Sequence, residues 1–238
     1  MDTTGLIDNR NLELWNSLRS VHEIEIRKES RQDYHAYSKS NKTIISVPYD
    51  NLDTASFTHE LLHIYLRTKD VFIGGGLTLS IKESEKLSKI FSDALIDHIG
   101  NSLDHIKMLP EFLKLGYPES EFISDYSTNK LTVEEIIKIK NNFKTNFLFK
   151  TTYNASAIDF FIGKYFAVSA CTNTTFDYPK ELAELKKIDV ELFEILETFV
   201  IEWKKYDYTN PDVLNSYHTI LFDFIEKLEK WTDNKTIK

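Results

Sequence analysis

The sequence contains very little cysteine, glycine and proline, and each shortage limits what the chain can be. Its 238 residues include a single cysteine, Cys171, which excludes an intramolecular disulfide and a metal site built from several thiolates. Only 7 glycines and 5 prolines are present. Because these residues form most tight turns, a β-sandwich with its many turns is disfavoured and long helices are expected.

The charge balance and the lack of long apolar runs exclude two further classes of protein. A total of 29 Lys and Arg residues oppose 37 Asp and Glu residues, a formal net charge of -8, whereas a general nucleic-acid binder needs a basic face. No apolar run reaches the roughly 18 residues that span a membrane, and the first residues, MDTTG, do not resemble a secretory signal. We therefore expect a soluble, cytoplasmic protein with no direct nucleic-acid partner and no membrane partner.

Hydrophobic periodicity predicts a mostly helical chain with one strand region near its N-terminus. Apolar residues three apart predict a short helix at 11–20. Runs rich in β-branched residues predict strands at 21–27 and 42–49, with 34–38 as a hairpin partner, and no other strand region is expected. The predicted fold class is α+β, predominantly α, with a small N-terminal sheet followed by a helical C-terminal half.

Capping residues mark several of the expected helices. Asp53 or Thr54 begins a helix that reaches about Leu66, and Thr132 with Glu135 forms a capping box for a helix of about 15 residues. Further helices are predicted at 83–108, 155–171, 180–205 and 211–231, the last with Asn210 as its cap and Pro211 at its first position.

The segments between these helices carry three further expectations. Gly74–Gly76 predicts a flexible loop, because glycine weakens helices and the pattern of a phosphate-binding loop is absent. Pro110 is expected to end the preceding helix and open a further turn. Since no repeat or low-complexity linker is present, a single domain is predicted, with the sheet and the helices of the H-E-x-x-H region in about 1–115 and a helical half in 116–238.

The residues from Thr58 to His63 read THELLH and contain the pattern H-E-x-x-H. On a helix, residues four apart lie about 40° apart around the axis, so His59 and His63 point in the same direction and can bind one ion. Zinc accepts neutral imidazole nitrogens and, in catalytic sites, keeps one position open for water. Glu60 lies about 60° from His63, close enough to accept a proton from that water.

The residues around this pattern favour a functional site. Between Thr54 and Leu66 the only charged or histidine residues are His59, Glu60 and His63, so the helix is predicted to be buried. Burying these side chains without partners is unfavourable, and a bound metal would offset the loss of solvation. The alternative is a core helix whose histidines hydrogen-bond to their neighbours.

The segment from Ser56 to Tyr65 resembles the active-site helix of the zincin metallopeptidases, including the uncharged residues at its flanking positions. The resemblance implies a Zn²⁺-dependent peptidase that acts on a peptide or protein substrate. It assigns His59 and His63 as metal ligands and Glu60 as the catalytic base. The resemblance covers roughly residues 42–115, and its specific part is six residues long.

Two further features belong to the same resemblance. Zincins place an edge strand beside the cleft to bind the substrate backbone, and Thr43–Val47 fits that place. The glycine and histidine of the metzincin extension are absent after His63, which leaves a gluzincin-like arrangement with a carboxylate ligand on a later helix.

Several acids between residues 91 and 105 are candidates for this third ligand. On a helical wheel Asp93, Asp97 and Asp104 share one stripe, which nearby lysines also make compatible with a solvated face. Asp104 is preferred, because its segment, NSLDH, resembles the asparagine-x-x-acid-histidine stretch of small bacterial HExxH proteins, where the acid is more often Glu. Asp97 is the runner-up. His105 is assigned to stabilising an oxyanion, with a core histidine as the alternative.

The leading hypothesis is therefore a zinc-dependent peptidase or related hydrolase. The alternative from another class is a non-catalytic helical binding or regulatory protein that retains a zincin-like fold. A zinc-dependent regulator with DNA-binding partners is a third hypothesis, which no basic segment supports. Apolar stripes on the helices after residue 150 are candidates for core packing or for a homodimer face.

Overall fold

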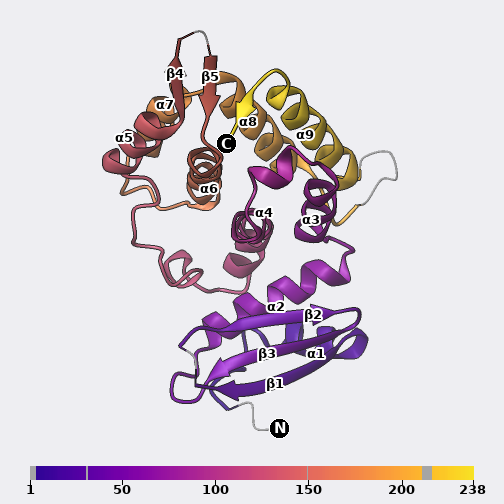
Figure 1. Cartoon of the computed structure of the whole chain (residues 1–238). Coiled ribbons are helices and arrows are strands. Elements are labelled where there is room, and N and C mark those ends of the chain that lie inside the picture. Colours follow the sequence, from indigo (N-terminus) through magenta and orange to yellow (C-terminus); the bar gives the residue numbers. More distant parts are fainter. Residues whose placement is uncertain (1–3, 31, 149, 211–215) are drawn as a thin grey trace. The chain divides into compact units, whose positions relative to one another are not determined.

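The computed structural model describes residues 4–30, 32–148, 150–210 and 216–238 and is mainly helical, with two small three-stranded sheets (Figure 1). The predicted class, α+β and predominantly α, is confirmed. The backbone contacts group into two compact units. Unit 1 contains Met1–Phe72 and Ile106–Ser127, and unit 2 contains Ile73–His105 and Thr128–Lys238. One helix, α4 (Asp93–Lys114), runs without a break through this division.

Unit 1 contains α1 (Leu12–Val21) and a sheet of three strands, β1 (Glu23–Glu29), β2 (His35–Lys39) and β3 (Lys42–Pro48). β3 lies in the middle, parallel to β1 and antiparallel to β2. The first helix and all three predicted strands are confirmed. The placement of Thr43–Val47 at a sheet edge is wrong, because β2 folds back beside β3 and itself becomes the outer strand.

Helix α2 (Thr54–Thr68) follows the sheet and carries the H-E-x-x-H pattern. The carboxylate of Asp53 accepts a hydrogen bond from the backbone nitrogen of Ser56 at 2.6 Å, which confirms the predicted N-cap. The apolar face of α2 is buried in one cluster with residues of α1 and the sheet, namely Phe57, Leu61, Ile64, Trp15, Leu18 and Ile45. This packing holds α2 against the sheet of unit 1.

Unit 2 is built mostly from helices. Its elements are α3 (Ile73–Glu83), the 3-10 turn η1 (Leu87–Lys89), the first part of α4, α5 (Val133–Asn142), β4 (Lys144–Phe147), β5 (Lys150–Tyr153), α6 (Ala155–Ala170), α7 (Tyr178–Lys186), α8 (Val190–Lys205), α9 (Tyr217–Thr232) and β6 (Thr236–Ile237). Phe199 of α8 stacks on Phe224 of α9, with ring centroids 4.0 Å apart. The indole nitrogen of Trp203 donates to the carbonyl of Leu103 at 2.8 Å and ties α8 to α4. Among the described residues, no helix is both long enough and apolar enough to cross a membrane.

The second sheet, in the order β4-β5-β6, corrects the expectation that strands occur only near the N-terminus. β4 pairs with β5 as a hairpin, and β6 pairs with β5 in parallel. These strands are short and mostly polar, so they carry no alternating pattern. β6 is stabilised by pairing with residues far away in the sequence, which local periodicity cannot reveal.

The predicted loop at Gly74–Gly76 is also wrong, because these residues form the first turn of α3. A Cβ atom built on Gly100 of α4 would lie 2.9 Å from the Cα of Gly74, and one built on Gly76 would lie 2.7 Å from the side chain of Leu221. The absence of a Cβ atom at Gly100 therefore lets α4 lie close to the backbone of Gly74, and its absence at Gly76 leaves room for the Leu221 side chain of α9. The gain in packing overrides the low helix propensity of glycine.

Several helix boundaries differ from the predicted ones. The expected helix at 83–108 is divided, and α4 begins only at Asp93 and continues through Pro110. The expected helix at 180–205 is two helices, because Asp189 caps a new one by accepting from the backbone nitrogen of Leu192 at 2.9 Å. α9 begins at Tyr217, capped by Ser216, while the predicted first position, Pro211, lies outside the described residues.

The capping box of α5 is confirmed. The backbone nitrogen of Thr132 donates to the carboxylate of Glu135 at 2.9 Å, and the backbone nitrogen of Glu135 donates back to the Thr132 hydroxyl at 3.3 Å. The helix has 10 residues, fewer than the 15 expected, because the chain turns into β4 after Asn142.

Candidate metal centre

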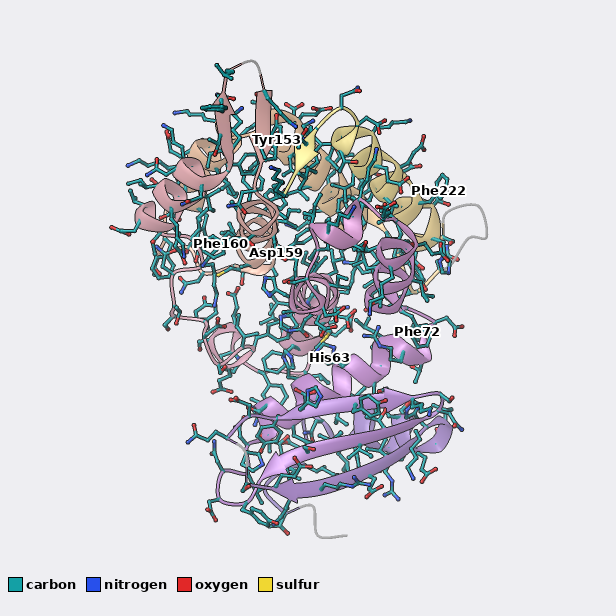
Figure 2. The ribbon with its side chains drawn as sticks, in the orientation of Figure 1. His63, Phe72, Tyr153, Asp159, Phe160 and Phe222 are labelled. Atoms are coloured by element: carbon teal, nitrogen blue, oxygen red, sulfur yellow. The ribbon has the colours of Figure 1, made fainter. Side chains whose placement is uncertain are left out.

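His59 and His63 lie one turn apart on α2 and form the centre of the candidate site. His63 is labelled in Figure 2. Their ring centroids are 5.1 Å apart, with the rings at 67° to each other. Each ring offers a nitrogen, and these two nitrogens lie within 4.8 Å of each other. Two nitrogens bound to one tetrahedral zinc ion are about 3.3 Å apart, so small rotations of the rings would bring both onto one ion.

The surroundings of His59 keep its imidazole neutral. Burial, followed by the neighbouring charge of His63, lowers the pKa of His59 to about 3, although a backbone hydrogen bond with Phe122 acts in the opposite direction. The centroids of the Phe122 and His59 rings are 4.8 Å apart, so Phe122 packs against His59. The neutral form of imidazole is the one that binds a metal.

Glu60 is buried between α2 and the outer strand β2, with 8% of its surface exposed. Burial raises the pKa of its carboxyl group. The charges of His63 and His35 and a hydrogen bond from the backbone of Ala36 lower the pKa and oppose this effect. The carboxylate therefore lies against the backbone of an edge strand, beside the two histidines of the pattern.

His35 and Ala36 are site residues that the sequence did not single out. Both belong to β2, 24 or more positions before Glu60, and only the pairing of β2 with β3 brings them to α2. Ala36 contacts Glu60 through its backbone nitrogen, which every residue except proline has, so no local sequence pattern could identify it.

Helix α4 supplies the third member of the cluster, His105. One ring nitrogen of His105 lies within 4.8 Å of the chosen nitrogens of His59 and His63, and all three side chains are half-buried. His105 directly precedes the part of α4 that belongs to unit 1, and the helix is continuous at this point.

The acids that were predicted as third ligands differ in their exposure. Asp104 is buried, with 2% of its surface exposed, and precedes His105 on α4. Asp93 and Asp97 are exposed, and Asp93 forms an ion pair with Lys82 at 3.2 Å. The burial of Asp104 favours it over Asp97, and both assignments stay predictions.

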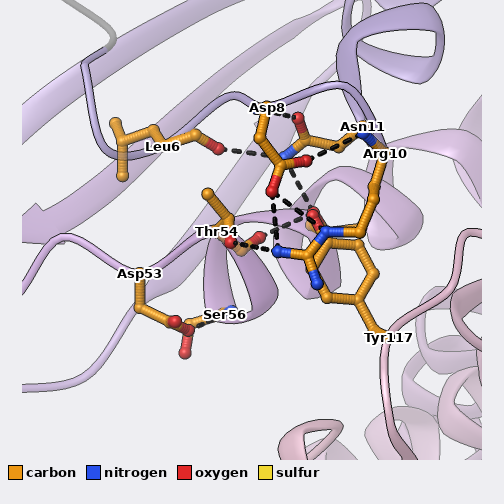
Figure 3. A network of polar contacts seen from close by, with 9 residues as sticks. Leu6, Asp8, Arg10, Asn11, Asp53, Thr54, Ser56 and Tyr117 are labelled. Carbon is orange, nitrogen blue, oxygen red and sulfur yellow. Dashed lines mark hydrogen bonds and ion pairs between the residues drawn. The ribbon is translucent and has the colours of Figure 1, made fainter.

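A network of hydrogen bonds holds the start of α2 in unit 1 (Figure 3). The hydroxyl of Thr58, the residue before His59, accepts from the Asn11 side chain at 2.9 Å and donates to the Tyr117 hydroxyl at 3.0 Å. Arg10 lies over the Tyr117 ring, 3.9 Å from its centroid, and donates to the Thr54 hydroxyl at 3.1 Å. The N-terminal segment thereby fixes the backbone that carries the first histidine.

The donor set fits zinc in its chemistry. Three imidazoles can occupy three positions of a tetrahedral ion and leave the fourth open, as in catalytic zinc sites. No family model, curated protein or solved structure matches this chain. The fold and the site together describe an α+β chain with a half-buried histidine cluster, in which α2, the H-E-x-x-H helix, supplies His59 and His63 and α4 supplies His105.

Proposed function

We propose that this chain is a zinc-dependent hydrolase that cleaves amide bonds in a peptide or protein substrate. The observation that supports this proposal is the nearness of the ring nitrogens of His59 and His63 on a helix that also carries Glu60. In this proposal the two histidines hold the metal. His105 is the third ligand, because its ring nitrogen belongs to the same cluster.

The residues of the chain have separate parts in this reaction. Zinc, when bound, supplies a Lewis acid that polarises a carbonyl group and activates water. Glu60 accepts the proton of the attacking water at its carboxylate and later delivers it to the leaving amine. The backbone nitrogen of Ala36 hydrogen-bonds to the same carboxylate and orients it.

The outer strand β2 offers a place for the substrate. It pairs with β3 along one edge and lies beside Glu60 along α2. An extended peptide can add to such an edge through backbone hydrogen bonds, with little dependence on its side chains. A substrate aligned in this way would place a backbone carbonyl near the histidine pair.

Metal content and turnover together test the proposal. Untagged protein, purified without chelator, is expected to contain about one zinc ion per chain by elemental analysis. Cleavage of a quenched fluorescent peptide library is expected to fall at least about 100-fold in Glu60→Gln, which removes the base and leaves the histidines in place. Glu83→Gln, on the exposed face of α3, is the matched control and should keep full activity.

Two results would contradict the proposal. Failure of the wild-type protein to retain zinc after dialysis against zinc would remove the metal site. Zinc binding without cleavage of any peptide in the library would leave the alternative, a non-catalytic binding or regulatory protein.

A further inference from the structure

The hairpin formed by β4 and β5 carries the two most exposed large apolar side chains among the described residues. Phe147 is 74% exposed and Leu148 is 83% exposed. Side chains of this kind are unfavourable in water, and several of them together mark a surface that contacts something else.

The hairpin extends beyond the helices of unit 2 (Figure 1). All four residues of β4 are exposed, so neither face of this strand packs on the helices. Lys144 pairs with Tyr153 at the base of the hairpin, and Phe147 pairs with Lys150 at its tip. Tyr153 is labelled in Figure 2. Three residue steps separate base and tip, about 10 Å. The apolar side chains are therefore at the projecting end.

The charge of this region is opposite to that of the whole chain. Between Glu135 and Asp159 there is no acidic residue, while the chain as a whole carries a net charge of -8. The lysines in this segment are Lys138, Lys140, Lys144 and Lys150. Lys150 lies directly opposite Phe147, so a positive charge adjoins the apolar tip.

We propose that the tip of this hairpin binds the surface of an anionic phospholipid membrane. Phe147 and Leu148 enter the boundary between headgroups and acyl chains, and Lys150 and Lys144 contact the lipid phosphates. Apolar side chains beside basic ones are the combination that holds proteins at such surfaces. Insertion of a tip needs no helix that crosses the membrane, so it is compatible with the helices described.

The shape of the hairpin favours a lipid surface over a protein or a nucleic acid. A stable protein interface buries about 800 Å² on each partner and uses 20–30 residues, far more than a projecting two-stranded tip presents. A single-stranded nucleic acid stacks successive bases on several aromatic rings, and among the described residues of the tip only Phe147 has such a ring. A bilayer accepts a small apolar tip and adds attraction for the lysines.

Vesicle sedimentation tests the proposal with two double variants of the hairpin and two double variants as controls. Phe147→Ser with Leu148→Asn removes the apolar tip, and asparagine suits the backbone at position 148, where φ is 53°. Lys144→Glu with Lys150→Glu reverses the charge. Leu79→Ser with Phe222→Ser, at exposed apolar positions on α3 and α9, and Lys28→Glu with Lys227→Glu are the matched controls.

The full-length wild-type chain is expected to bind phosphatidylcholine vesicles that contain phosphatidylserine, and to bind them less as salt is added. Both hairpin variants should bind at least about tenfold more weakly, whereas both controls should bind as the wild type does. Circular dichroism and the melting temperature should be unchanged in all four variants, since every substituted side chain is exposed.

Three outcomes would overturn the proposal. The first is a wild-type chain that does not bind these vesicles. The second is unchanged binding after loss of the apolar tip. The third is a change of oligomeric state in the tip variant, measured by light scattering, which would make the hairpin a contact between copies of this chain.

Discussion

The side-chain amide of Asn11 donates a hydrogen bond to the hydroxyl of Thr58 at 2.9 Å, which joins the N-terminal segment to the residue before His59. The same amide nitrogen donates to the carbonyl of Leu6 at 2.9 Å, and the Asn11 oxygen accepts from the backbone nitrogen of Asp8 at 3.0 Å. Asn11 is fully buried. One side chain therefore satisfies three separate polar groups in the interior of unit 1.

Asn11→Ala is expected to destabilise the protein strongly. The substitution leaves the Leu6 carbonyl and the Asp8 backbone nitrogen without this partner, at a total cost of about 2–4 kcal/mol in the free energy of unfolding. Urea denaturation measures the change. Asn142→Ala is the control, because Asn142 bonds to a carbonyl at an exposed helix end, and should change stability by less than about 0.5 kcal/mol. Equal effects of the two variants would contradict the prediction.

Two glycines in unit 2 are expected to respond in opposite ways to alanine. A Cβ atom on Gly100 would lie 2.9 Å from the backbone of Gly74, so Gly100→Ala should destabilise by about 1–3 kcal/mol. A Cβ atom on Gly75 would meet nothing within 4 Å inside α3, so Gly75→Ala should stabilise by about 0.5–1 kcal/mol. Thermal unfolding of both variants measures the difference, and two shifts of the same sign would refute this account of the α3–α4 contact.

His22 is expected to make stability fall at acidic pH. The His22 ring is buried, and its Nε2 atom lies 2.8 Å from Oγ1 of Thr43. Burial lowers the pKa of the ring. In the unfolded chain the pKa is about 6.5, so the unfolded state binds more protons below that pH. The contribution of His22 is complete above pH about 6.5 and decreases as the pH falls towards the lowered pKa.

His22→Asn should therefore flatten the dependence of stability on pH below about 6.5. Urea unfolding across this range, compared with the wild type, measures the effect. The control is His218→Asn, on an exposed position of α9, which should leave the pH dependence as it is. If the wild type and His22→Asn show the same dependence of stability on pH, His22 does not cause the loss of stability at acidic pH.

Zinc binding by two neighbouring variants on α4 would identify the third ligand. If His105 is the ligand, His105→Asn should weaken zinc binding by more than about 100-fold, and Asp104→Asn should weaken it by less, as groups around ligands do. Competition with a chelator measures both affinities, and circular dichroism checks that both variants fold. The reverse order of effects would assign the metal to Asp104.

The candidate site shows which of its parts local sequence can reveal. His59, Glu60 and His63 lie within two turns of one helix, whose start is set by the neighbouring Asp53, so the predicted helix was enough to bring them near one another. The cluster with His105 and the contact of Glu60 with Ala36 were not predictable. Both are contacts between α2 and elements far away in the sequence, and the geometry of a single helix does not predict which distant elements come close to it.

The errors in the predicted fold have the same origin. Gly74 and Gly76 favour a loop by propensity, and only the close approach of α4 and α9 makes a helix the better structure. The sheet of β4, β5 and β6 is completed by a strand from the end of the chain. Such pairing is stabilised by partners and not by the residues of the strand itself.

The sequence by itself determined the helical character of the chain, the first sheet, the caps of α2 and α5 and the histidine pair of the H-E-x-x-H pattern. These features rest on interactions between residues a few positions apart, which periodicity and capping rules describe. Only the tertiary structure decided that β2 is the edge strand beside Glu60, that His105 joins the histidine pair and that Phe147 and Leu148 stand exposed on a projecting hairpin. Burial and exposure, and contacts between distant elements, arise when the whole chain packs, because the free energy of each contact depends on partners that local sequence does not specify.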